Sequence, residues 1–424
     1  MLVTATLFIR PGEIFQPLLG FEFFFYFIVS CFLLSFQTVF GQLSKRSLQS
    51  QPITVCVLGI LMAIVLSDLA HFEIEALIDQ TWAFVKTLMY YLLLVGLVNT
   101  PKRLRQFLFW LWFFTLIFII LTLLNHHGII HLNMRVTATD SYVSKMGEVV
   151  GITRMTGSGL FADPNDLCMV TNMGFVLGLY WLGDRLYPLP RVLYLASSLT
   201  FGYALLQTQS RGGFLALLLA CSVLLLNRYG WKKAAMIAAP GLPVLMVAIG
   251  GRITHISTEE STAQSRMEMW ALAFELFKSS PLFGVGAGKF LQYSELVAHN
   301  AYIHAYAELG LFGGSFFIAA FFWALWTLYQ MGKGHLENLE PNLRRAHAYI
   351  TAIIAGAATL LMTLSQTYYM TTYMILGLVT VYLRITNASN LVKFYRVDSF
   401  FIKRLSVIGI VAVVTLNVIV RVLK

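Results

Sequence analysis

Three side chains, Arg211, Arg266 and His299, are the strongest candidates for chemistry in this sequence. Arg211 lies between two apolar stretches, in the short turn Gln-Ser-Arg-Gly-Gly. A charge at the mouth of an apolar region is costly and is usually retained for a function. Arg266 begins an amphipathic stretch, and His299 precedes a return to apolar sequence. A histidine in that position could act as a base at neutral pH.

Each candidate also has a structural interpretation that the sequence leaves open. Arg211 could extend its side chain to the membrane surface, Arg266 could be a solvated helix residue, and His299 could be a structural hydrogen-bonding group. Asp163 begins the segment Asp-Pro-Asn-Asp, which is typical of a helix N-terminus. A ligand contact is the alternative for Asp163. No His-Glu-x-x-His motif or acidic pair at metal spacing occurs in an apolar stretch, so we expect no metal site.

The glycine-rich segment Gly-Val-Gly-Ala-Gly-Lys-Phe at 284–290 superficially resembles a phosphate-binding loop. It lacks the Gly-x4-Gly-Lys-[Ser/Thr] spacing and follows no predicted strand. We therefore predict a tight turn that returns the chain toward the membrane, because glycine adopts backbone conformations that other residues avoid.

The composition predicts an all-α, polytopic membrane protein. Hydrophobic residues make up 58% of the chain and charged residues 12%, with a mean hydropathy of +0.72; soluble domains average roughly 45–50% and 25%. The apolar stretches lack strand alternation, so we expect helices that cross a bilayer. The net charge of +10 comes from lysines and arginines in short loops, which disfavours nucleic acid as a partner. The four cysteines form no CxxC pair, so we expect no disulfide framework or zinc site.

The apolar stretches predict about twelve transmembrane helices in a single domain, residues 1–424. No cleavable signal peptide is recognised, because Arg10 and Pro11 interrupt the first apolar run. The charge bias leaves one alternative open at the N-terminus: either residues 1–16 belong to a further crossing, or one early span is wrong. The expected spans lie near residues 17–40, 53–70, 82–99, 106–124, 166–183, 189–208, 212–228, 232–250, 303–330, 347–367, 370–386 and 404–422.

Loop charges predict which segments lie outside the cell. Clusters of lysine and arginine alternate with acidic or mixed loops, and the positive-inside rule makes the mixed loops external. Two long segments, 125–165 and 251–302, are then external. Within the second, 265–278 reads as an amphipathic helix with Trp270 and Phe274 on its apolar side, facing lipid or the helix bundle.

Four motifs between residues 150 and 315 resemble those of one superfamily in their order and spacing. Ser-Arg-Gly-Gly-Phe-Leu at 210–215 resembles the Arg-x3-Leu element of bacterial O-antigen ligases, and 266–290 resembles an external-loop signature shared by these ligases and the O-antigen or exopolysaccharide polymerases. His299-Asn300, nine residues and Gly310 resemble the ligases' His-[Asn/Ser/Gln]-x9-Gly element; Phe-Ala-Asp-Pro-Asn at 161–165 also recurs. The ligase branch is favoured. The long loop follows the eighth span, one helix earlier than the ligases' pattern.

The resemblance implies a GT-C-like fold and a glycosyltransferase of the bacterial inner membrane, with its active site facing the periplasm. The donor would be a glycan on undecaprenyl pyrophosphate, the acceptor lipid A–core oligosaccharide, and no cofactor or metal would be needed. Displaced pyrophosphate gains negative charge, which suits arginine. Pyrophosphate would contact Arg211 and Arg266, and His299 would be the general base, all three meeting in one pocket. Further substrate contacts would come from Arg154, Asp163, Asn165, Trp270 and Asn300.

Two alternative functions remain. A polymerase would use the same donor but join it to another lipid-linked glycan, and it shares the loop signature. A glycan transporter would also have about twelve spans. Transporters tend to have repeated halves and ionisable residues at broken helices near mid-membrane. The predicted spans here are nearly free of ionisable residues, so transport is the less favoured alternative.

Overall fold

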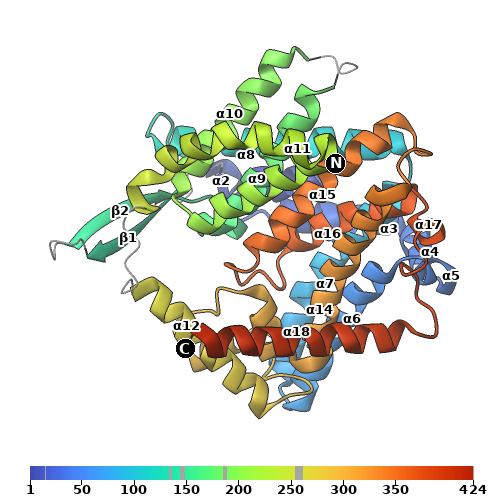
Figure 1. Cartoon of the computed structure of the whole chain (residues 1–424). Coiled ribbons are helices and arrows are strands. Elements are labelled where there is room, and N and C mark those ends of the chain that lie inside the picture. The colour runs from blue at the N-terminus through green and yellow to red at the C-terminus, as the bar shows by residue number, and fades with distance from the viewer. Residues whose placement is uncertain (15, 133–135, 144–148, 185–188, 254–260, 424) are drawn as a thin grey trace. The chain divides into compact units, whose positions relative to one another are not determined.

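The computed structural model describes residues 1–14, 16–132, 136–143, 149–184, 189–253 and 261–423. The chain divides into two compact units, each built from two separate segments. The first unit comprises Met1–Cys31 and Lys102–His255, and the second comprises Phe32–Pro101 and Ile256–Lys424. Figure 1 labels the elements of both units. The assignment of the whole chain to one transmembrane domain stays a prediction.

The first unit is built from helices and one hairpin. Helix α9 begins at Pro164 because the Asp163 side chain accepts a hydrogen bond from the backbone N–H of Asn165 at 2.7 Å. Glycines on α9 let α10 approach closely, since a Cβ at Gly174 would lie 2.5 Å from the Phe201 ring. The elements are α1 (Leu2–Ile9), α2 (Pro11–Ile14), η1 (Gln16–Leu18), α3 (Phe23–Leu34), α8 (Pro101–His126), β1 (Thr137–Val143), β2 (Val149–Met155), η2 (Gly159–Phe161), α9 (Pro164–Leu182), α10 (Arg191–Thr208) and α11 (Arg211–Ile253).

The second unit is helical in the part of the chain that the structure describes. Its centre is α14, which packs against α6, α12, α15 and α18. Its elements are α4 (Phe36–Gln42), α5 (Lys45–Gln49), α6 (Pro52–Ala70), α7 (Ile74–Leu97), α12 (Ser261–Ser279), α13 (Phe290–Tyr293), α14 (Ala301–Gly334), α15 (Pro341–Leu360), α16 (Met370–Ile385), α17 (Ala388–Leu391) and α18 (Phe401–Leu423).

Every stretch that the sequence marked as a span contains helix, although 17–40 is divided between α3 and α4 and 347–367 runs past the end of α15. The number of crossings stays a prediction. Within the described residues, five helices are long and apolar enough to cross a membrane, or six if α3 and α4 form one bent span. Gly230, with φ 72°, interrupts α11 between the two stretches predicted there. At the N-terminus α1 has eight residues, fewer than the ~17–25 that a helical span needs. The five helices are Pro52–Ala70, Pro101–His126, Arg211–Ile237, Ala301–Gly334 and Phe401–Val422.

A β-hairpin in the first long connecting segment is the part of the fold that the all-helical prediction missed. Strands β1 and β2 pair antiparallel, with Thr137 opposite Met155 and Val143 opposite Val149. The strands contain threonine and valine, and β2 also isoleucine, whose branched side chains favour extended backbone. The predicted helices are unaffected, because the hairpin lies between α8 and α9.

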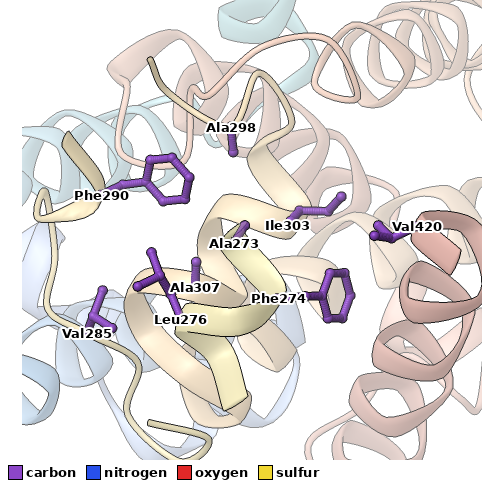
Figure 2. Packing of buried hydrophobic residues seen from close by; sticks show 9 residues of the cluster. All are labelled: Ala273, Phe274, Leu276, Val285, Phe290, Ala298, Ile303, Ala307 and Val420. Atoms are coloured by element: carbon purple, nitrogen blue, oxygen red, sulfur yellow. The ribbon is translucent and has the colours of Figure 1, made fainter. Parts of the chain in front are cut away.

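The amphipathic helix predicted at 265–278 is confirmed as α12, and its apolar side faces the second unit's own helices. Phe274 is buried with Ile303 and Ala307 of α14 and Val420 of α18, as Figure 2 shows. Trp270 is partly buried against the same cluster. Of the two environments expected for this side, the structure therefore gives the helix bundle.

Gly310 interrupts α14 with a non-helical backbone conformation, and its replacement would show how closely the surrounding backbone is packed. Its φ of 64° is left-handed, and a Cβ there would lie 2.4 Å from the Leu282 carbonyl carbon. We expect Gly310→Ala to lower the stability of the purified protein by at least ~1–3 kcal/mol, because alanine avoids this conformation and clashes with backbone. Gly334→Ala, where a Cβ meets nothing within 4 Å, is the matched control. Equal thermal unfolding of the two variants in detergent would contradict the expectation.

Candidate functional site

The turn that carries Arg211 is anchored by a buried polar cluster in the first unit. Asn165 Oδ1 accepts hydrogen bonds from Ser210 Oγ at 2.5 Å and from Arg154 Nη2 at 3.3 Å. Arg154 also donates from Nε to the Thr208 carbonyl at 3.0 Å. Both Arg154 and Asn165 are 9% exposed. These contacts tie β2 and the start of α9 to the turn between α10 and α11.

Arg211 itself is the first residue of α11 and is partly exposed. Gln209, with φ 48°, ends α10 in a left-handed conformation, and Ser210 Oγ then accepts a hydrogen bond from Gly213 N at 3.0 Å. Ser210 therefore acts as the helix cap. The start of a helix carries a partial positive charge that favours anions. Arg211 adds a full positive charge at that position, so this end of α11 suits a negatively charged group.

Three of the substrate contacts predicted from the sequence have structural partners in this cluster. The N-terminal cap predicted for Asp163 is confirmed by its hydrogen bond to Asn165 N. Asn165 binds the serine immediately before Arg211. The structure thus brings Arg154, Asp163 and Asn165 together around the Arg211 turn, and their direct contact with a substrate stays a prediction.

His299 is held in a fixed backbone conformation in the second unit. Its φ is 48°, a left-handed value that is uncommon outside glycine. On one side Trp270 Nε1 donates to the Ala298 carbonyl at 2.8 Å. On the other, Asn300 Oδ1 accepts from Tyr302 N at 3.1 Å and from Ile303 N at 3.2 Å, and so caps α14. The His299 side chain is partly exposed. Its position depends on the hydrogen bonds that fix the backbone at Ala298 and Asn300.

Arg266 lies on α12, one helical turn before Trp270, and is partly exposed. Residues four apart lie on one face of a helix. The face that includes Arg266 is therefore the face that Trp270 joins to the Ala298 carbonyl. The Trp270 hydrogen bond thus joins α12, which carries Arg266, to the segment that carries His299 and Asn300. A common pocket for Arg211, Arg266 and His299 stays a prediction.

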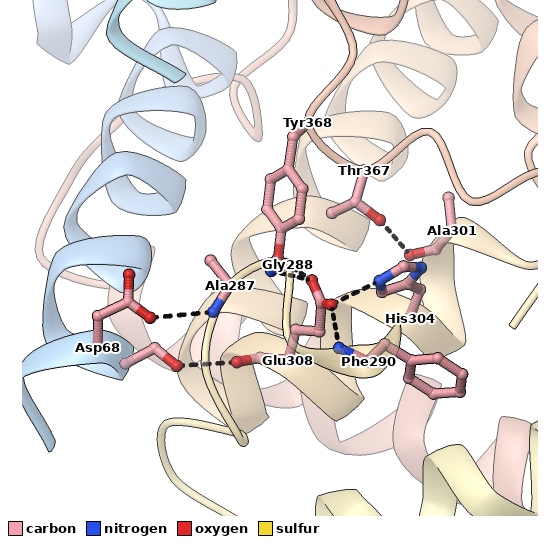
Figure 3. A network of polar contacts seen from close by, with 10 residues as sticks. Asp68, Ala287, Gly288, Phe290, Ala301, His304, Glu308, Thr367 and Tyr368 are labelled. Carbon is pink, nitrogen blue, oxygen red and sulfur yellow. Dashed lines mark hydrogen bonds and ion pairs between the residues drawn. The ribbon is translucent and has the colours of Figure 1, made fainter. Parts of the chain in front are cut away.

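A second polar group in this unit, centred on Glu308 of α14, was missed by sequence reasoning. Its carboxylate is 1% exposed and accepts hydrogen bonds from Gly288 N at 2.9 Å, Phe290 N at 2.9 Å and Tyr368 OH at 2.8 Å, as Figure 3 shows. His304 Nε2 lies 2.9 Å from the same carboxylate. Burial, together with the Glu308 carboxylate, raises the pKa of the Tyr368 phenol well above its usual range. Tyr368 therefore stays protonated, and its hydroxyl is the donor in the hydrogen bond to Glu308.

The glycine segment at 284–290 wraps around this carboxylate. Gly284, Gly286 and Gly288 have φ values of 71°, 114° and 72°, so the predicted tight turn is confirmed. A Cβ at Gly284 would lie 2.2 Å from the Glu308 carbonyl carbon, which explains why only glycine fits there. The loop's backbone N–H groups bind an anion, as those of phosphate loops do, but the anion is the chain's own Glu308.

Further contacts fix the same loop from α6 and the segment after it. Asp68 Oδ1 accepts from Ala287 N at 3.2 Å, and Ser67 Oγ donates to the Glu308 carbonyl at 2.8 Å. Lys289, 5% exposed, forms an ion pair of 3.2 Å with Glu73. The loop, α6 and α14 thus form one connected polar network in the second unit.

One sequence signal could have revealed this group. His304 and Glu308 are four residues apart, so they lie on one face of a helix. A glutamate inside a predicted span is costly unless it is paired. Together these two facts predict an internal partner for Glu308, although they do not identify the glycine loop as that partner.

A comparison with protein families agrees with the motifs. Residues 196–318 match the model of a family described as O-antigen ligase. The match includes the Arg211 turn, α12, His299 and the first half of α14. None of the curated proteins matches the chain. The resemblance seen in the motifs is thereby confirmed for residues 196–318, which are similar to the O-antigen ligase family.

Proposed function

We propose that this protein is an O-antigen ligase-type glycosyltransferase that moves a glycan from undecaprenyl pyrophosphate to lipid A–core oligosaccharide at the periplasmic face of the bacterial inner membrane. The observation that carries the proposal is the family match, because it covers Arg211, Arg266 and His299 in one segment, residues 196–318. The apolar helices give such an enzyme access to a lipid-linked donor.

The chemistry proposed for these residues balances without a cofactor. An acceptor hydroxyl oxygen attacks the anomeric carbon of the donor glycan, and the bond from that carbon to the pyrophosphate oxygen breaks. His299 takes the hydroxyl proton. The departing undecaprenyl pyrophosphate gains negative charge, which Arg211 and Arg266 stabilise. The cleaved pyrophosphate linkage supplies the energy, so transfer should persist in the presence of a metal chelator.

The supporting residues act through the three reacting side chains in this proposal. Trp270 and Asn300 hold the backbone on either side of His299. Arg154 and Asn165 fix the Arg211 turn, and Asp163 caps α9 beside it. Precise placement of reacting groups accounts for a large part of enzymatic rate enhancement, so indirect residues of this kind affect the rate.

One reaction separates the proposed ligase from a polymerase, the second candidate that the shared loop signature supports. Purified protein is given an undecaprenyl-pyrophosphate-linked glycan, with or without lipid A–core. A ligase releases undecaprenyl pyrophosphate only when lipid A–core is present. Glycan lengthening without lipid A–core would show a polymerase, and no reaction in either mixture would favour transport of the intact donor.

The two arginines provide a graded test of pyrophosphate binding. We expect Arg211→Gln and Arg266→Gln each to lower the transfer rate by about 10²–10³, the usual effect of removing one group that stabilises a developing anion. Arg→Lys at either position should restore only part of the rate, since lysine keeps the charge but loses the two-pronged contact. Arg344→Gln, at an exposed position in α15, is the control. Full activity in both glutamine variants would contradict the assignment.

A further inference from the structure

A polar cavity of about 690 Å³ lies in the second unit, apart from the Glu308 group and from His299. One wall is the segment around α5, including Ser44, Arg46 and Ser47, and the other is the segment around α17, including Asn390 and Arg396. The walls are joined by a hydrogen bond from the backbone N–H of Val397 to the Gln49 carbonyl, at 2.9 Å. We name this space the α5–α17 cavity.

The lining of the α5–α17 cavity suits a small anion. Serine hydroxyls and asparagine and glutamine amides supply hydrogen-bond donors, and Val397 is the one apolar residue among the described residues that line it. With no aromatic ring in that lining, the cavity offers no surface on which a nucleotide base could stack. The ligand should therefore be compact, polar and rich in oxygen acceptors.

Among the described residues, no carboxylate pairs with either of the two arginines that line the cavity. Arg396 donates from Nε to the Ser389 carbonyl and from Nη2 to Asn390 Oδ1, both at 2.5 Å, and both acceptors are neutral. Arg46 is exposed. The cavity's one carboxylate, that of Asp398, is already paired with Arg404 outside the lining. Two guanidinium groups without a matching carboxylate attract phosphate.

The surroundings of the cavity place it at the ends of apolar helices. Helix α4 ends at Gln42, just before the first wall, and exposes Phe36 and Phe40. Helix α18 begins three residues after Asp398 and exposes Ile402. Only 17% of the most apolar part of this helix is buried within the protein. If these helices cross the membrane as predicted, their exposed apolar side chains face acyl chains. A polar cavity where the helices end is then expected at the depth of lipid headgroups.

We propose that the α5–α17 cavity binds the phosphate headgroup of an anionic phospholipid. Its acyl chains lie along the exposed apolar side chains of α4 and α18, and its phosphate oxygens accept hydrogen bonds from Arg46, Arg396 and the serine hydroxyls. This site is separate from the proposed glycan transfer, and neither Arg46 nor Arg396 takes part in that reaction.

Native mass spectrometry of the full chain, released from detergent with defined lipids, tests the proposal. We expect phosphatidylglycerol to be retained at least tenfold better than phosphatidylethanolamine. Arg46→Gln should lower the retention of phosphatidylglycerol about tenfold, the usual effect of losing one charge-assisted contact. Arg46→Lys should keep most of it. Arg46 is exposed, so its replacement spares the core.

Arg344→Gln removes the same charge from an exposed position outside the cavity and should bind phosphatidylglycerol like the unchanged protein. Equal retention of the two lipids would overturn the proposal, as would equal losses in Arg46→Gln and Arg344→Gln. Displacement of the lipid by millimolar inorganic phosphate would also overturn it, because the site would then serve a soluble anion. Transfer activity should be normal in Arg46→Gln, which separates this outcome from the proposed function.

Discussion

His299→Asn is expected to lower glycan transfer by about 10²–10⁴, the usual contribution of a positioned general base. Asparagine is the informative replacement, because it tolerates left-handed backbone better than other non-glycine residues and so suits the φ of 48° at this position. The flanking contacts, Trp270 to Ala298 and Asn300 to the first turn of α14, do not involve the imidazole. The variant should therefore fold and insert normally while losing the base.

The rate is measured with purified protein, lipid-linked glycan and lipid A–core, at equal amounts of membrane-inserted enzyme. His335→Asn, at the other end of α14, is the matched control and should transfer at the normal rate. Normal transfer by well-inserted His299→Asn would remove His299 from the mechanism. A loss of transfer accompanied by an equal loss of folded protein would instead assign His299 a purely structural role.

Glu308→Ala is expected to destabilise the protein by ~3–5 kcal/mol, because it removes the acceptor of several buried hydrogen bonds and each stranded donor costs ~1–3 kcal/mol. The change leaves the Gly288 and Phe290 N–H groups and the Tyr368 hydroxyl without their acceptor. Unpaired buried donors carry a large desolvation cost. The glycine loop, anchored to α14 through this carboxylate, should then lose its fixed conformation.

Thermal unfolding in detergent, followed by the fraction of protein that stays monodisperse, measures this effect. The unfolding temperature of Glu308→Gln should lie between those of the unchanged protein and Glu308→Ala. The glutamine amide oxygen can accept some of the hydrogen bonds, but the negative charge is lost. Glu337→Ala, at an exposed position after α14, is the control. An unfolding temperature for Glu308→Ala equal to that of the control would mean that the carboxylate does not hold the loop.

The helices were predictable because their signal is local. Stretches of apolar residues mark the long helices, and the cap at Asp163 marks where α9 begins. The cap that Asn300 forms on α14 was not predicted. The hairpin of β1 and β2 was missed because its strands are short and set between strong helical patterns. Its branched residues favour a strand only when a partner strand is present, and the sequence does not show that pairing.

The candidate site was predictable only in part, for the same physical reason. Motif order led to Arg211, Arg266 and His299, and to neighbours such as Asn165 and Trp270. Their contacts join residues far apart in the chain, as when Asn165 binds Ser210. The glycine loop was recognised as a turn, but the anion it binds comes from Glu308, twenty residues after Gly288. Within the second unit, the packing of α6 and α12 against α14 brings the glycine loop and Glu308 together, and local sequence patterns do not reveal such packing.

The most direct test of the central claim, that this protein breaks the pyrophosphate linkage while it joins the glycan to an acceptor hydroxyl, is a product balance. Mass spectrometry quantifies undecaprenyl pyrophosphate released and glycan joined to lipid A–core, by purified protein with a metal chelator present. We predict equal molar amounts of the two products from the unchanged protein and almost none from His299→Asn. Intact lipid-linked donor after prolonged incubation with well-folded protein would contradict the claim.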